Sequence, residues 1–206
     1  MRRFSHHLCL GLFLLHEAAH AFQPLITDDT GTQGSGGNQI EFSLNHDRTT
    51  TGVEIARTAT FPLVFTHGLT DTLDLFVGAS HVRVRPAPSR SATSGGGNPA
   101  LGLKWRFYEN TASQTSLALK PEFALPVSRS GEDAGRGTGR LSYGLTLILT
   151  QELPSGAIHA NLGSDRSRYR DTTVNPNASV LRASLAPVWD VAEHWKLALD
   201  LGVQRE

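Results

Sequence analysis

Apolar residues alternate with polar or small residues along most of this chain, and that pattern limits the folds open to it. The clearest example covers residues 73–79, where Leu73, Leu75 and Val77 alternate with Asp74, Phe76 and Gly78. A period of two places the apolar side chains on one face of a β-strand. Nine such segments follow one another, and the pattern predicts strands at about 39–45, 53–65, 73–81, 99–107, 114–125, 141–149, 157–164, 180–191 and 195–203.

The connections between these segments alternate in length. Those after the second, fourth, sixth and eighth predicted strands are short, whereas those after the third, fifth and seventh are long. The first connection, residues 46–52, is intermediate. Outer-membrane barrels have short turns at one end and longer loops at the other. No helical period interrupts the series, so the sequence predicts an all-β protein, an antiparallel up-and-down transmembrane β-barrel over residues 39–206.

An odd number of strands is unusual, because bacterial barrels have an even number. The chain also stops at Gln204-Arg205-Glu206 without a terminal aromatic strand. Either a strand is miscounted or the chain is truncated, and we favour a barrel that is truncated at its C-terminus.

A barrel in lipid turns its apolar face outward and encloses the other face. The seven aromatic residues Phe61, Phe65, Trp105, Phe107, Tyr143, Trp189 and Trp195 share the apolar phase of their strands. The opposite face supplies the lumen-lining candidates Glu41, Glu54, Asp74, Lys104, Arg106, Lys120, Glu122, Lys196 and Asp200. The alternative is a soluble periplasmic β-barrel that binds an apolar ligand. It predicts the reverse arrangement, with apolar residues inward and charges outward.

The first 21 residues resemble a secretory signal peptide, with Arg2 and Arg3 before an apolar core at 8–15 and an Ala-His-Ala cleavage site at 19–21. We therefore expect export to the outer membrane of a Gram-negative bacterium. Residues 22–38 are expected to form a polar, periplasmic lead-in segment. The only cysteine, Cys9, and a zinc-protease-like His-Glu-Ala-Ala-His at 16–20 both fall in the segment that processing would remove.

Composition excludes several classes of function. The formal net charge is zero, which argues against nucleic acid as a partner. The glycine-rich stretch after Asp28-Asp29 lacks the Lys-Ser/Thr of a phosphate loop, and this acidic pair lacks EF-hand spacing. The five histidines of the mature chain, His46, His67, His81, His159 and His194, show no ligand or dyad spacing. We expect no enzyme, no catalytic residue, no metal and no cofactor.

Several motifs resemble those of one bacterial family. They are Pro24-Leu-Ile-Thr-Asp-Asp-Thr-Gly-Thr-Gln-Gly, Gly36-Gly-Asn-Gln-Ile-Glu41, Gly68-Leu-Thr-Asp-Thr-Leu-Asp-Leu-Phe-Val-Gly78 and Asn98-Pro-Ala-Leu-Gly-Leu-Lys-Trp105. They are similar to motifs of the outer-membrane, transporter-like family named for the MetA pathway of phenol degradation. The resemblance implies a barrel of somewhat greater length that acts as a channel or transporter for small, hydrophobic or aromatic solutes. Its partners would be outer-membrane lipid and that solute, and it supplies no catalytic residues.

Overall fold

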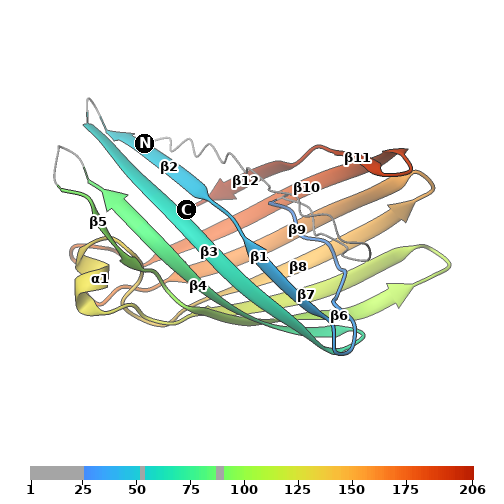
Figure 1. Ribbon diagram of the computed structural model, residues 1–206, viewed down its shortest axis with the longest axis horizontal. Coiled ribbons are helices and arrows are strands. Elements are labelled where there is room, and N and C mark those ends of the chain that lie inside the picture. The colour runs from blue at the N-terminus through green and yellow to red at the C-terminus, as the bar shows by residue number, and fades with distance from the viewer. Residues whose placement is uncertain (1–25, 52–53, 87–90) are drawn as a thin grey trace.

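The described part of the chain forms one antiparallel sheet that curls into a half-barrel (Figure 1). The structure is a computed structural model, and it describes residues 26–51, 54–86 and 91–206. The expected signal peptide and its zinc-protease-like motif lie outside these residues. The strands are β1 (Asn38–Phe42), β2 (Asn45–Thr51), β3 (Glu54–Thr70), β4 (Leu73–Arg85), β5 (Thr93–Gly96), β6 (Ala100–Asn110), β7 (Thr115–Ala124), β8 (Ser142–Leu153), β9 (Gly156–Ser167), β10 (Ala178–Ala192), β11 (Trp195–Ala198) and β12 (Leu201–Arg205).

These strands make nine rows, because three rows are interrupted. β1 and β2 both pair with β3, β5 and β6 both pair with β4, and β11 and β12 both pair with β10. Every interruption involves a proline, which lacks the N–H that a ladder needs. Pro62 faces the break between β1 and β2, Pro187 faces the break between β11 and β12, and Pro99 lies within the third. Each of the nine predicted strands corresponds to one of these nine rows, so the predicted number of strands is confirmed.

Within the described residues, no ladder joins the first row to the last, so the sheet is open. Short turns connect β3 to β4, β6 to β7, β8 to β9 and β10 to β11, and they lie together at one end, here the short-turn end (Figure 1). The opposite, long-loop end carries the connection that contains the short helix α1 (Arg129–Asp133). This sorting agrees with the predicted alternation of connections.

Two predicted connections were wrong in part. Residues 46–51 were expected to be a connection but form most of β2, which pairs with residues 54–60 of β3. Residues 93–96 were expected in a long loop but form β5. Both strands are polar and lack an apolar alternation. Their backbone ladders extend the sheet beyond its apolar part, and a ladder needs no apolar side chain.

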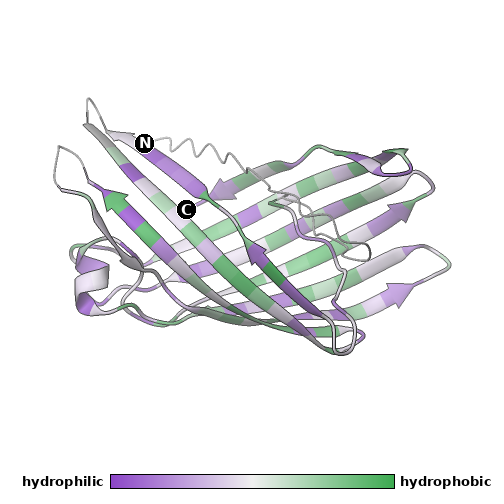
Figure 2. Ribbon diagram, viewed as in Figure 1, coloured by the Kyte–Doolittle hydropathy of each residue, from purple (hydrophilic) through white to green (hydrophobic). Residues whose placement is uncertain are grey.

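Hydrophobic and hydrophilic residues alternate along the strands (Figure 2). Their exposures place the large apolar side chains on the convex face and many polar side chains on the concave face. Leu145 and Leu199 are each 49% exposed, whereas Lys104 is only 7% exposed. Outward leucines meet across strands, as in the row Leu119, Leu147 and Leu162 of β7, β8 and β9. A soluble core requires the opposite arrangement.

We call the exposed large apolar side chains of the strands the apolar belt. Its members are Ile40, Phe42, Phe61, Leu63, Phe65, Leu69, Val77, Leu101, Leu103, Trp105, Phe107, Tyr108, Phe123, Tyr143, Leu145, Leu147, Leu153, Leu162, Leu181, Leu185, Trp189, Val191, Trp195, Leu197, Leu201 and Val203. All seven predicted aromatic residues belong to it. Trp105 lies opposite Leu73 and Trp189 opposite Gly156, so these rings and Trp195 lie near the short-turn end.

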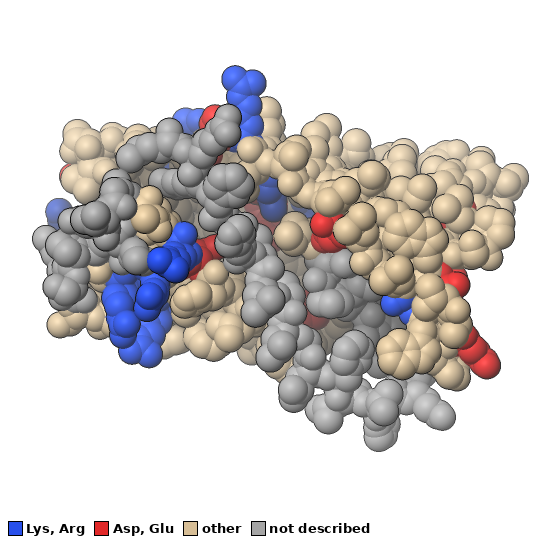
Figure 3. Space-filling model, turned by 90° about the horizontal axis from the view of Figure 1, so that it is seen from above, with Lys and Arg blue, Asp and Glu red and all other residues tan. Residues whose placement is uncertain are grey.

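Charged side chains are also visible in the hollow of the sheet in a view from above, where uncharged residues cover most of the surface (Figure 3). The concave face is not polar throughout. Ala118, Ile148 and Ala186 are fully buried on it, and Val188 lies opposite Ala157.

No helix among the described residues is long and apolar enough to cross a membrane.

Candidate functional site

The concave face encloses a cavity of about 950 Å³. Five of the nine lumen-lining candidates border it. Glu41 projects from β1, Asp74 from β4, Lys104 from β6, and Lys120 and Glu122 from β7. Strand alternation explains this grouping, because all five share the phase opposite to the apolar belt.

The other four candidates lie elsewhere. Arg106 forms an ion pair with Glu109 at 3.3 Å and donates to the carbonyl of Asp71. Lys196, on the edge row, pairs with Asp190 at 2.9 Å. Asp200 lies in the break between β11 and β12. Glu54 begins β3, and its side chain lies outside the described part of the structure.

Three ionisable side chains of the strands also border the cavity but were not among the lumen-lining candidates. Asp165 and Arg182 form an ion pair at 2.7 Å across β9 and β10, and His159 lies buried on β9. The predicted strands at 157–164 and 180–191 carried few charges on which to base an assignment, and the first of them ended one residue before Asp165. A regular inward phase, extended along both strands, would have found all three.

The lead-in segment, here Ile26–Gly37, crosses the concave face from the last row of the sheet toward the first. At one end the backbone N–H groups of Ile26 and Thr27 donate to the Asp200 carboxylate, and the Thr27 hydroxyl donates to it at 2.6 Å. At the other end Gly36 N–H donates to the carbonyl of Gly68 at 2.8 Å, and Gly68 N–H donates to that of Gly37 at 2.9 Å. The sequence pattern did not predict that the lead-in segment docks on the sheet.

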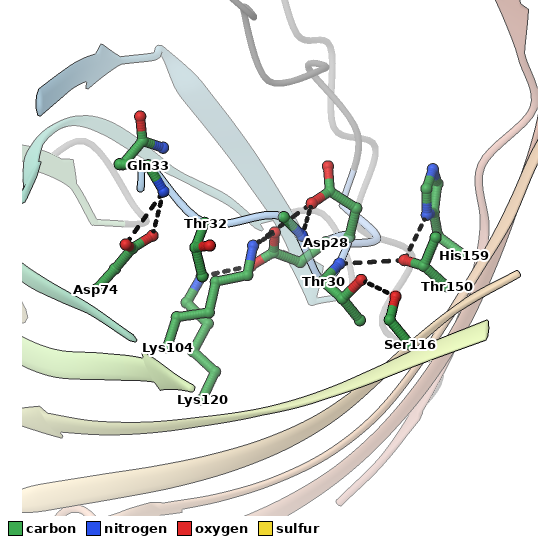
Figure 4. A network of polar contacts seen from close by, with 12 residues as sticks. Asp28, Thr30, Thr32, Gln33, Asp74, Lys104, Ser116, Lys120, Thr150 and His159 are labelled. Atoms are coloured by element: carbon green, nitrogen blue, oxygen red, sulfur yellow. Dashed lines mark hydrogen bonds and ion pairs between the residues drawn. The ribbon is translucent and has the colours of Figure 1, made fainter. Parts of the chain in front are cut away.

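Ion pairs of Asp28 bind the segment to the sheet (Figure 4). One carboxylate oxygen lies 3.0 Å from Nζ of Lys104, and the other lies 2.7 Å from Nζ of Lys120. Asp29 adds a longer ion pair with Lys104 at 3.6 Å. Burial favours a higher pKa for Asp28, but the two ammonium groups outweigh it and lower the pKa to about 2. The carboxylate is therefore ionised and paired.

A buried hydroxyl network continues along the same segment (Figure 4). The Thr30 N–H donates to Oγ1 of Thr150 at 3.1 Å, which in turn lies 3.0 Å from Nδ1 of His159. The Thr30 hydroxyl lies 2.5 Å from that of Ser116. Farther along, Gln33 N–H donates to both carboxylate oxygens of Asp74 at 3.1 and 3.0 Å. Polar groups of the segment thus contact side chains of four strands, β4, β6, β7 and β8.

Two glycines permit the close approach of this segment and of its neighbours. A Cβ added to Gly68 would lie 1.7 Å from the carbonyl oxygen of Gly34, so β3 can accept the segment only where it has no side chain. A Cβ on Gly102 would lie 2.2 Å from the Phe76 ring, which packs there beside Lys120. The lead-in segment and the residues around Gly68 and Gly102, which are far apart in sequence, therefore form one contact network.

This network can bind and orient polar groups. Within residues 26–51, 54–86 and 91–206, no group of three or more His, Cys, Asp or Glu side chains is arranged to hold a metal ion.

The loss of stability caused by removing the Asp28 charge should depend on pH. A carboxyl group whose pKa is lowered in the folded chain stabilises the fold at pH values above its unfolded pKa of 3.8. This stabilisation is lost as the pH falls toward the folded pKa of about 2. We expect the Asp28→Asn variant to be less stable than the unmodified chain by about 2 kcal/mol at neutral pH. Urea unfolding in detergent at several pH values measures this difference, which should be flat from about pH 5 to pH 8 and mostly lost at about pH 2. An unchanged difference at the lowest pH would contradict the ion-pair assignment.

Comparison with known proteins places the chain in a family. No curated protein and no solved structure matches it. A family model described by the MetA pathway of phenol degradation matches residues 21–205, which include the lead-in segment and all twelve strands. The chain therefore belongs to the family named for the MetA pathway of phenol degradation.

Proposed function

We propose that this protein is an outer-membrane β-barrel channel or transporter that passes small molecules along its concave face. The observation that carries the proposal is the inverted sheet, whose leucines and aromatic rings face outward while Lys104 and Asp74 are buried inward. Hydrocarbon satisfies such a convex face, whereas water does not. Outer-membrane lipid is then the partner of the apolar belt, and an N-terminal signal peptide directs export.

The cavity supports transport rather than catalysis. Its charged groups are largely occupied with one another or with the lead-in segment, as in the pairs Asp165–Arg182 and Asp28–Lys120. The family description suggests hydrophobic or aromatic compounds as solutes. We place small molecules of this class, carrying at least one polar group, in the cavity because its wall offers hydroxyl, amide and carboxylate groups beside the Phe76 ring.

The soluble alternative, a periplasmic barrel around an apolar ligand, requires apolar residues inside. The outward exposure of Leu147, at 40%, and the cavity position of its neighbour Thr146 favour the membrane proposal.

Cysteine labelling distinguishes these two candidates. In a Cys9→Ser background an introduced cysteine is the only thiol of the chain. We expect Leu147→Cys in outer-membrane fractions to resist a water-soluble maleimide and to react with a lipid-soluble one, because lipid covers the belt. The adjacent Thr146→Cys is the matched control and should show the reverse preference. Recovery of the protein in the soluble periplasmic fraction, with both positions equally reactive in water, would overturn the proposal.

A further inference from the structure

Four arginines gather on the convex face at the long-loop end. Arg48 of β2 lies directly opposite Arg57 of β3, which lies directly opposite Arg85 of β4. Arg83 is on the same face, two residues along β4 from Arg85. All four side chains are exposed. We call these four residues the arginine patch.

Among the described side chains, no carboxylate forms an ion pair with the arginine patch. By strand alternation, the acidic residues of these rows whose side chains the structure describes, Glu41, Asp47 and Asp74, point to the concave face. Within the described part of the chain, none of the four guanidinium groups has an ion pair or a side-chain hydrogen bond. Like charges directly opposite each other on neighbouring strands are destabilising. The patch therefore favours anions that come from outside the chain.

The arginine patch borders the apolar belt. Ala59 and then Phe61 and Leu63 follow Arg57 on the outward face of β3, and Phe42 lies opposite Leu63 on β1. These large side chains are exposed, from 47% for Phe61 to 71% for Phe42. A cluster of cations thus continues directly into an exposed apolar surface. A free inorganic anion would use only the first of these two features.

We propose that the arginine patch binds the headgroup of a lipid that carries more than one phosphate, whose acyl chains lie along Phe61, Leu63 and Phe42. Guanidinium groups bind phosphate with two parallel hydrogen bonds, and four of them on adjacent strands can hold two phosphates. Basic clusters at the edge of a bilayer-spanning surface recognise anionic lipids for the same reason. This inference rests on the proposed function, because it places the long-loop end at a headgroup layer.

The test uses the full chain, folded in neutral detergent, with diphosphoryl lipid A as the probe and phosphatidylcholine as the neutral lipid. We expect the Arg57→Gln, Arg85→Gln double variant to bind lipid A roughly tenfold more weakly than the unmodified chain does. Native mass spectrometry measures the fraction of each protein that carries bound lipid A. Without phosphate lipid the same variant should unfold at a higher urea concentration than the unmodified chain, because a like-charge contact has been removed. This opposite sign separates lost lipid binding from a folding defect.

The matched control removes the same charge from the same face. Arg166 of β9 and Arg205 of β12 lie in rows separated by β10, and the Arg166→Gln, Arg205→Gln variant should bind lipid A as the unmodified chain does. Equal lipid A binding by the Arg57→Gln, Arg85→Gln variant would overturn the inference. A chain that enters phosphatidylcholine bilayers but shows no preference for lipid A leaves the proposed function intact and removes only this inference. A chain that enters no bilayer removes both.

Discussion

Replacement of both Lys104 and Lys120 by methionine should release the lead-in segment and destabilise the protein by about 3 kcal/mol. The Asp28 carboxylate, 24% exposed in the folded chain, would then lie in the cavity without a cation. An unpaired carboxylate in such a position costs more than the loss of one hydrogen bond, since water cannot fully replace the two ammonium groups. The segment is not part of any strand ladder, so it can leave while the sheet persists.

Two measurements check this prediction. Urea unfolding in detergent gives the loss of stability, and the thiol reactivity of a Thr30→Cys reporter, buried in the docked segment, gives the release. The matched control adds Asp28→Asn to the double variant. This neutral triple variant should recover most of the lost stability, because no buried charge is left unpaired. A triple variant no more stable than the double variant would show that the lysines act through packing and not through Asp28.

Arginine at position 185 should destabilise the protein in a lipid bilayer by about 2–4 kcal/mol, the cost of a cation at the lipid-facing midplane of a barrel. Leu185 lies in the middle of β10, 44% exposed on the convex face, with Ala160 and Leu201 on its two sides. Unfolding from lipid vesicles, compared with unfolding from detergent, measures the effect.

Ser184→Arg provides the control for this substitution on the adjacent residue. Ser184 borders the cavity, with Gly202 opposite it, so a cation there has room and water. We expect a change of less than about 1 kcal/mol for Ser184→Arg. Equal costs at positions 184 and 185 would show that both faces of β10 meet the same medium, and the membrane proposal would then fail.

The alternation of apolar and polar residues predicted most of the fold. The nine predicted rows were confirmed because each buries or exposes one face consistently, and alternation records that difference residue by residue. The polar extensions escaped prediction for the same reason. β2, from Asn45 to Thr51, has no apolar phase, and it is held by backbone pairing to β3 alone.

The candidate site was predictable only in part. Glu41, Asp74, Lys104, Lys120 and Glu122 border one cavity because phase alone assigns them to a face. For the other candidates, position along the strand decides whether the side chain reaches the cavity. Arg106 lies near a short turn and Lys196 on the edge row, where the same phase does not lead into the cavity.

The sequence by itself determined that the chain folds as an antiparallel sheet with one apolar and one polar face, since that information is local and repeats every two residues. The tertiary structure decided what those faces enclose. Only the curled sheet brings Asp28 to Lys104 and Lys120, residues 76 and 92 positions away along the chain. It also aligns Arg48, Arg57 and Arg85 across three strands. Such contacts depend on strand register and curvature, which combine hydrogen bonds from the whole sheet and leave no local mark in the sequence.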